Sequence, residues 1–465
     1  MPSQSNIGNK KQELVQAVAF VFEECTRLQR LLEEGIRTKD GIKRIPREDA
    51  FHTIPHPTGG GSILCGRAAA MKLEKLAEEA GRRSGLSRRV ERDTLLRPLG
   101  ELIVQRFLRE KRPLDVTQVE RVLSAVGKQA RASCTDIEHL VPCHLMHAKD
   151  PAELRVGPVV FRNRSVFRRF ILDKLQAKNS HENKRKRNRW VLARALKYYR
   201  NFNWVAQVTV KCCDPKTSAR IAERAVTSAL DCLHLVLGAQ STYKMRVAGP
   251  AVRTDRRGSL TISADGRLRS SASVAWAGQV NFEAGWSKCL DRPEYQRLLE
   301  LCGVALEAAV DPDLERPLSH RFLDAAQWFG EASRDDSPST SVVKYVTALE
   351  RMVMTEEKND IAKLVSERVA AICFDPHAND RDAWREKART AYDLRSKLVH
   401  GAMSPRAPEV WRGLGIGAEL GEATLLHTLS HFGEAGLRME TISPRKLGQW
   451  FNQVIDWADK TPKPV

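Results

Sequence analysis

The spacing of hydrophobic residues divides the chain into three regions. Over residues 1–137 apolar residues recur three or four positions apart, as at Leu14, Val18 and Phe22. This is the period of an amphipathic helix, and proline and glycine interrupt it between residues 55 and 61. We therefore predict a helical N-terminal region.

The middle region, residues 138–317, has a different period. The apolar stretch 203–210 predicts a strand. Asp214-Pro215 follows it, and an N-cap residue before proline predicts the start of a helix, which should end at Gly238.

A hairpin is expected further along the middle region. The stretches 260–263 and 268–272 flank Asp265-Gly266, a dipeptide typical of tight hairpin turns. Residues 273–282 suggest another strand. Strands and helices therefore alternate here, and the middle region is expected to be α+β.

The helical period returns over residues 318–465. Apolar residues there form successive helix faces, one of them including Val346 and Leu349. Two more helices are expected at about 417–438 and 444–458. The predicted fold is a multidomain α+β protein with a helical N-terminal region, an α+β middle region and an all-α helical bundle at the C-terminus.

Composition narrows the class of protein. The 465 residues are 42% hydrophobic and 29% charged, as expected for a globular protein. The ten cysteines include no CxxC pair, which indicates reduced thiols in a cytoplasmic protein. The longest early apolar run, residues 14–22, is about half a bilayer span, so we expect neither a signal peptide nor a membrane helix.

The charge of the chain is large and uneven. The formal net charge is +19, and a basic protein attracts polyanions. Residues 160–200 alone carry 14 basic and two acidic side chains, whereas residues 318–465 are nearly neutral. Aromatic residues are interleaved with these basic residues; they suit base stacking, although we expect most of them to pack in a core.

One run of charge within this stretch is the strongest candidate for contact with RNA. It consists of Lys184, Arg185, Lys186, Arg187 and Arg189. Because neighbouring like charges destabilise a helix, a solvated structural face explains the run poorly. A nuclear-import signal is a weaker interpretation.

Two other patterns are weaker candidates for function. Gly59-Gly60-Gly61-Ser62 resembles a phosphate loop but lacks its GK[ST] ending, so a plain flexible loop is the preferred interpretation. His139, Cys143 and His147 recur every four residues and would form one face of a helix, near Cys134. Pro142 interrupts that helix, so a zinc site is not favoured.

An arginine and a histidine near the end of a predicted helix form the main candidate for catalysis. Arg395 and His400 are five positions apart, which places them roughly 140° apart around a helix and about 7.5 Å along it. One helix would therefore not aim both at the same atom, whereas two copies across a two-fold axis could form a composite site. Histidine can transfer protons in RNA cleavage, and a guanidinium can bind the phosphate.

The segment from Tyr392 to Gly401 resembles the signature of the Apea-like HEPN family, in which an arginine is followed a few residues later by a histidine. Upstream segments agree with this family: residues 321–329, 347–350 and 367–370 fall on successive predicted helices. The resemblance covers about residues 318–402 well. It implies a helical HEPN fold, homodimerisation through that domain, and metal-independent ribonuclease activity in bacterial defence or toxicity.

The resemblance also implies roles for individual residues. Arg395 and His400 would be the catalytic pair, and Glu350 a polar support. Ser396 departs from the family pattern, because many HEPN nucleases have Asn, Asp or His directly after the arginine. A serine hydroxyl would still hydrogen-bond a phosphate. No cofactor or metal is expected.

Three functional hypotheses follow. The first is a cytoplasmic, metal-independent endoribonuclease that cleaves tRNA, mRNA or rRNA as an anti-phage or toxin effector, with a possible phage-derived trigger. The second is a non-catalytic nucleic-acid-binding or phage-sensing protein that uses the HEPN helices only as a dimerisation scaffold. The third is a membrane-surface or protein scaffold that uses its basic segment on acidic lipids.

Overall fold

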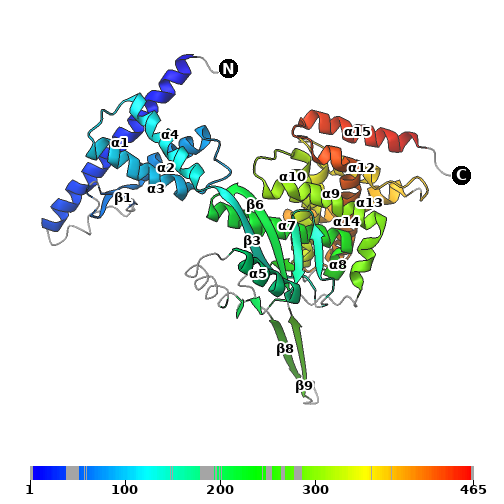
Figure 1. Cartoon of the computed structure of the whole chain (residues 1–465). Helices are drawn as coiled ribbons and strands as arrows, with labels where there is room; N and C mark the ends of the chain where they lie inside the picture. The colour runs from blue at the N-terminus through cyan, green and yellow to red at the C-terminus, as the bar shows by residue number, and fades with distance from the viewer. Residues whose placement is uncertain are drawn as a thin grey trace. The chain divides into compact units, whose positions relative to one another are not determined.

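The computed structural model describes most of the chain. The described residues are 4–37, 52–56, 58, 60–146, 148, 150–178, 193, 196–197, 199–200, 202–242, 245–247, 254–262, 268–276, 285–357, 359–378 and 380–461. They form two compact units, which we describe separately: residues 1–137 with 211–220, and residues 138–210 with 221–465. Helices predominate, and the fold is mixed α+β (Figure 1).

The first unit is mainly helical. Its elements are α1 (Gln4–Arg37), β1 (His52–Pro55), β2 (Ser62–Cys65), α2 (Arg67–Arg83), α3 (Arg92–Ile103), a π-helical turn η2 (Val104–Arg109) and α4 (Val116–Ala132). Helices α1 to α4 pack against one another around a core that includes Leu76, Leu99 and Val126. The predicted helical character of residues 1–137 is confirmed for most of this region.

The first unit also contains a hairpin that the hydrophobic pattern does not predict. Strands β1 and β2 are antiparallel, with Ile54 opposite Ile63 and Pro55 opposite Ser62. The glycine-rich segment therefore connects two strands, and His56 N–H donates to the carbonyl of Gly61. Because β2 and not a helix follows the glycines, their setting is not that of a phosphate loop.

A five-stranded sheet has the strand order β4-β5-β6-β3-β7. The strands are β3 (Thr135–His144), β4 (Glu153–Val156), β5 (Val159–Asn163), β6 (Trp204–Cys213) and β7 (Arg246–Val247). The pairs β4–β5, β5–β6 and β3–β7 are antiparallel. Helices α5 (Arg164–Lys178), α7 (Pro215–Leu237) and α8 (Ala239–Thr242) belong to the same part of the sequence.

The detailed predictions for the middle region are largely correct. The strand expected at 203–210 is β6, and the helix expected after Asp214 is α7, which ends before Gly238. Gly238 has φ +87°, a conformation that favours glycine.

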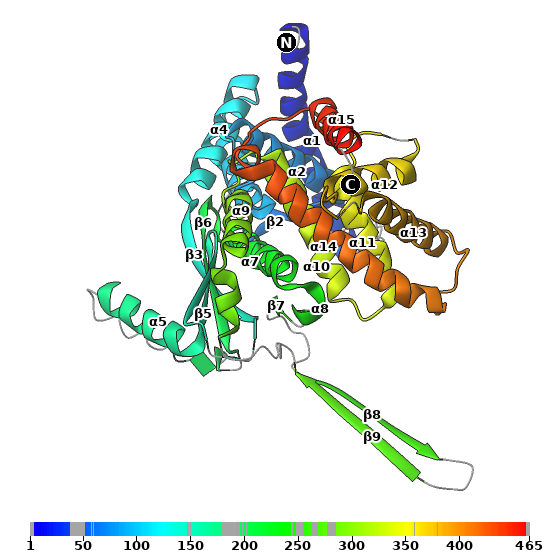
Figure 2. The same cartoon turned by 90° about the vertical axis from the view of Figure 1, so that its right-hand side faces the viewer.

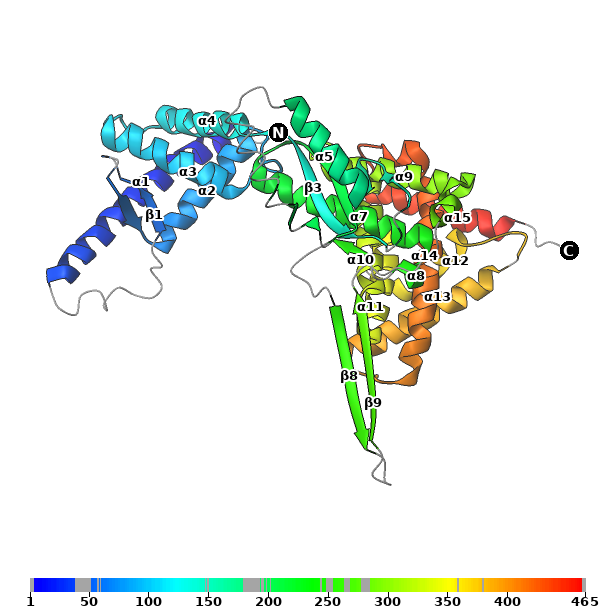
Figure 3. The ribbon, with the colours of Figure 1, turned by 60° about the horizontal axis from the view of Figure 1, so that its bottom comes forward.

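The predicted hairpin is also present. Strand β8 (Thr254–Ile262) pairs with β9 (Leu268–Trp276), and Figure 3 shows the two strands side by side along their length. The turn dipeptide Asp265-Gly266 lies outside the described residues. The prediction that a separate strand begins at Ser273 is wrong, because Ser273 lies inside β9.

The second unit continues through a 3-10 turn, η3 (Trp286–Asp291), into seven helices within residues 293–460. They are α9 (Pro293–Val310), α10 (Pro317–Ser333), α11 (Pro338–Val353), α12 (Ile361–Ile372), α13 (Arg381–Val399), α14 (Pro408–Leu437) and α15 (Pro444–Lys460). Their presence confirms the helical character predicted for 318–465. Helix α14 begins earlier than expected, at Pro408.

Helix α14 lies against α9, α10, α11 and α13 (Figure 2). Three glycines four residues apart, Gly413, Gly417 and Gly421, permit this close packing. A Cβ atom on Gly413 would lie 2.6 Å from Leu394 of α13, and one on Gly417 would lie 3.1 Å from Tyr345 of α11. A Cβ atom on Gly421 would lie 2.8 Å from Phe329 of α10. The absence of side chains along this stripe therefore determines how closely three helices approach α14.

None of the helices in the described part of the chain is both long enough and apolar enough to cross a membrane.

We predict that Gly421→Ala lowers the free energy of unfolding by about 1–3 kcal/mol, because the added methyl group would overlap the fully buried Phe329 ring. The matched control is Gly415→Ala on the same helix, where a Cβ meets nothing within 4 Å. That substitution should be neutral or stabilising by up to about 1 kcal/mol. Denaturant unfolding measures the free energy of unfolding of both variants. An equal change in the two variants would contradict the proposed packing constraint.

Candidate functional site

The structure brings two of the predicted site residues together. Arg395 on α13 and Glu350 on α11 approach to 3.5 Å between Nη2 and Oε2. Their side chains are 25% and 21% exposed, so the pair lies at the surface but is partly shielded from water. Partial shielding strengthens the attraction between opposite charges relative to a fully exposed pair.

Helix packing explains why these two residues meet. Each directly follows a buried leucine: Leu349 precedes Glu350, and Leu394 precedes Arg395. Leu394 packs in a small apolar cluster with Val342 of α11 and Val410 of α14. Burial of the leucines orients α11 and α13, and the adjacent polar residues then lie at the edge of the same contact.

Tyr392 is a third member of this cluster, and the sequence did not predict a role for it. Its ring centroid lies 5.7 Å from the guanidinium carbon of Arg395, and the negative charge of Glu350 acts on its phenol group. Burial, followed by the negative charge of Glu350, raises the pKa of Tyr392, although Arg395 partly opposes this. The sequence did contain a signal for this contact. Tyr392 precedes Arg395 by three positions, and residues three apart lie on the same face of a helix.

His400 lies at the end of α13, apart from this cluster. It is the C-cap residue, its side chain is exposed, and its backbone N–H donates to the Ser396 carbonyl at 3.0 Å. Gly401 follows with φ +72°, which ends the helix. No contact found among the described residues joins the imidazole to Arg395. Ser396 is half-buried on the last turn.

Exposed apolar side chains lie close in sequence to the histidine. Val399 is 50% exposed and Trp411, in the first turn of α14, is 66% exposed. Leu398 and Met403 are partly buried and pack against the cluster that contains Leu394. Exposed apolar residues form a protein-contact surface when they make one contiguous patch.

The predicted RNA-binding run, Lys184 to Arg189, lies outside the described residues. Part of the surrounding basic stretch is described. Arg162 pairs with Glu153 at 2.9 Å and lies over the ring of Phe170, so it is a structural residue. Phe161 and Phe167 are buried, as expected for packing residues.

The weak zinc pattern has no structural support. His139 and Cys143 lie on strand β3, not on a helix, and four strand residues span about 13 Å, too far for two ligands of one ion. His147 is outside the described part. Within that part, no three His, Cys, Asp or Glu residues are grouped as metal ligands.

Comparison with known protein families, curated protein sequences and solved structures finds no match to the chain. The HEPN resemblance therefore remains a prediction from sequence.

We predict that Glu350→Gln lowers the pKa of Tyr392, because it removes the negative charge that opposes loss of the phenolic proton. The measurement is an absorbance titration of tyrosinate, with Tyr392→Phe subtracted to isolate this residue. Glu409→Gln, an exposed change on α14, is the control and should leave the pKa unaltered. An unchanged pKa in Glu350→Gln would contradict the Glu350–Tyr392–Arg395 cluster.

Proposed function

We propose that the chain is a metal-independent endoribonuclease of the HEPN type. The observation that carries the proposal is that Arg395 of α13 lies beside Glu350 of α11, and that His400 caps the end of α13. A guanidinium and an imidazole supply the two functions that cleavage of RNA at its own 2′-hydroxyl requires, which are charge stabilisation and proton transfer.

The chemistry assigns each residue a role. The 2′-hydroxyl attacks the adjacent phosphorus and loses its proton to one neutral His400. A protonated His400 donates a proton to the 5′-oxygen as the bond to phosphorus breaks, leaving a 2′,3′-cyclic phosphate and a 5′-hydroxyl. Arg395 binds the phosphate oxygens as negative charge develops on them. Glu350 and Tyr392 orient Arg395, and Ser396 donates a hydroxyl hydrogen bond to the phosphate.

This mechanism uses one neutral and one protonated copy of His400, so it requires two copies of the chain. Across a two-fold axis, the ends of two α13 helices would contribute two copies of Arg395 and His400 to one composite site. Val399, the residue before His400, and Trp411 on α14 are exposed and would supply apolar surface for such a homodimer. The separation of His400 from Arg395 within one chain also favours this arrangement.

Other parts of the chain would supply substrate capture. The net charge of +12 over residues 160–200, including Lys184 to Arg189, would attract tRNA, mRNA or rRNA, with a phage-derived trigger as the activating partner. The second candidate is a non-catalytic nucleic-acid-binding or phage-sensing protein. The ion pair of Arg395 with Glu350 favours this second candidate, because Glu350 already engages one nitrogen of the guanidinium that would otherwise bind the phosphate.

We predict that Arg395→Ala and His400→Ala each reduce RNA cleavage by at least about 100-fold, because each removes a group acting in the transition state. The assay uses labelled RNA in EDTA, so that it also tests independence from metal. Matched controls are Arg389→Ala, an arginine of α13 that is 54% exposed, and the exposed His377→Ala.

Both control variants should retain activity. Cleavage that persists in Arg395→Ala and His400→Ala, or that EDTA abolishes in the wild type, would refute the mechanism. Salt-dependent RNA binding without any cleavage products would support the second candidate.

We further predict that an excess of His400→Ala protein inhibits the wild-type protein by more than dilution accounts for. A mixed dimer keeps only one of the two histidines that the composite site requires. The matched control is an equal excess of Arg389→Ala protein, which keeps both histidines and should not inhibit. Wild-type activity that persists, although native mass spectrometry detects mixed dimers with His400→Ala, would contradict a composite site with two histidines.

A further inference from the structure

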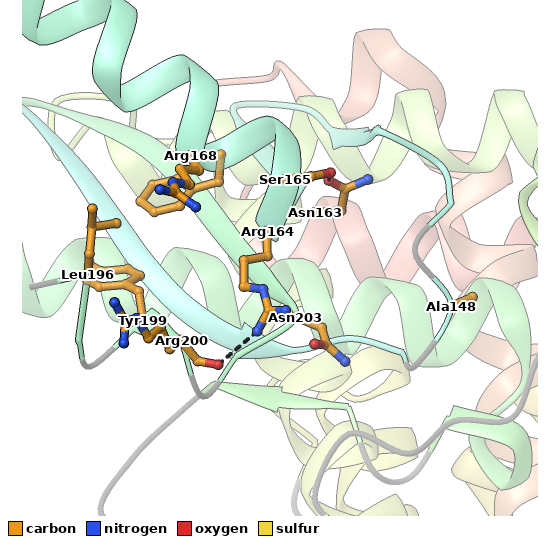
Figure 4. A pocket seen from close by; sticks show the side chains of 10 residues that line it. Ala148, Asn163, Arg164, Ser165, Arg168, Leu196, Tyr199, Arg200 and Asn203 are labelled. Atoms are coloured by element: carbon orange, nitrogen blue, oxygen red, sulfur yellow. Dashed lines mark hydrogen bonds between the residues drawn. The ribbon is translucent and has the colours of Figure 1, made fainter.

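A pocket separate from the Arg395 cluster lies in the basic stretch of the second unit. Its volume is about 550 Å³, within the range of small-molecule sites. The lining combines three arginines, two aromatic rings and two amides with small or apolar residues, and none of these residues is acidic. They are Ala148, Asn163, Arg164, Ser165, Phe167, Arg168, Leu196, Tyr199, Arg200 and Asn203 (Figure 4).

Strand pairing brings the two sides of the pocket together. Asn163 at the end of β5 is opposite Trp204 at the start of β6. Directly beyond that pair, Arg164 N–H donates to the Asn203 carbonyl at 2.8 Å. The Arg164 side chain then donates through Nη1 to the Arg200 carbonyl at 2.9 Å. The pocket is thus supported by hydrogen bonds between its walls.

An aromatic stack forms part of the lining. The ring of Tyr199 lies parallel to that of Phe167, with 5.3 Å between centroids and 19° between planes. Phe167 is buried, and the Tyr199 hydroxyl donates to the Leu140 carbonyl at 2.5 Å. Tyr199 is therefore fixed at both its ring and its hydroxyl, so it could stack with a planar ligand at little cost in conformational entropy.

The described residues around the pocket do not neutralise its positive charge. Among the described residues, no carboxylate pairs with Arg164, Arg168 or Arg200, whereas nearby Arg162 pairs with Glu153. Three guanidiniums around one hollow repel one another unless an anion lies between them. The α5 N-terminus is not the anion site, because Asn163 Oδ1 already accepts from Val166 N–H at 3.0 Å.

We propose that this pocket binds one nucleoside phosphate unit. The phosphate contacts the guanidiniums of Arg164, Arg168 and Arg200, and the base stacks on Tyr199. The exposed Asn203 amide offers both a donor and an acceptor to the edge of the base. The ligand is either a free mononucleotide or the phosphorylated end of an RNA strand. This inference does not depend on cleavage at Arg395 and His400.

The test is calorimetric titration of the full chain carrying Arg395→Ala, so that RNA is not cleaved. The probes are the four nucleoside monophosphates, ribose 5-phosphate, and a short RNA with either a 5′-phosphate or a 5′-hydroxyl. A nucleoside monophosphate or the 5′-phosphorylated RNA should bind at least about ten-fold more tightly than ribose 5-phosphate, because stacking adds to the binding energy. Binding of free mononucleotides identifies one source, and binding of only the phosphorylated RNA identifies the other.

Charge reversal at adjacent residues provides the matched control. Arg168 and Arg169 are both exposed on α5, but only Arg168 lines the pocket. Arg168→Glu should weaken binding by about ten-fold or more, whereas Arg169→Glu should change it much less. Three results would overturn the proposal: no binding of any nucleoside phosphate probe, equal binding of ribose 5-phosphate, or equal weakening by the two reversals while both variants remain folded.

Discussion

Close packing of α14 is the constraint on which the C-terminal helices depend. Because Gly413, Gly417 and Gly421 carry no side chains, α13, α11 and α10 reach the surface of α14 through Leu394, Tyr345 and Phe329. Leu394 and Val342 are buried in the same contact, which fixes α11 against α13. Glu350 and Arg395 meet at the edge of this packing, so their approach is a consequence of the apolar contacts beneath them.

The ion pair at this edge limits what Arg395 can do. Its separation of 3.5 Å is long for a charge-assisted hydrogen bond, so in the proposed mechanism the phosphate would displace only a weak interaction. The negative charge of Glu350 also raises the pKa of Tyr392, so this carboxylate interacts with both of its neighbours in the cluster. The cluster thus orients the guanidinium without fully neutralising it, as an anion-binding arginine requires.

Much of the fold was predictable because local signals agreed with the tertiary structure. The helical periods of 318–465, the strand that became β6 and the hairpin β8–β9 were all visible in sequence. Strands β1 and β2 were not, because four residues each are too few to show a period. The four-residue spacing of His139 and Cys143 suggested a helix, but both residues lie on strand β3, which pairs between β6 and β7 in the sheet.

The candidate site was predictable only in part. Sequence spacing and family resemblance selected Arg395, His400 and Glu350, but the role of Tyr392 depends on a contact between α11 and α13. Likewise, the basic excess of residues 160–200 was visible, whereas the pocket formed by Arg164, Arg168 and Arg200 needs the pairing of β5 with β6. Periodicity and charge counts do not show which distant segments of the chain pair with each other, so neither feature could be predicted from them.

The proposed chemistry at Arg395 and His400 is tested most directly by a substrate that is modified at one atom. After the cleavage site in an RNA is mapped, a matched RNA is made with 2′-deoxyribose on the 5′ side of that site. The account predicts cleavage of the unmodified RNA to a 2′,3′-cyclic phosphate and a 5′-hydroxyl, and none at the modified position. Failure to cleave either RNA, or equal cleavage of both with 5′-phosphate ends, would contradict it.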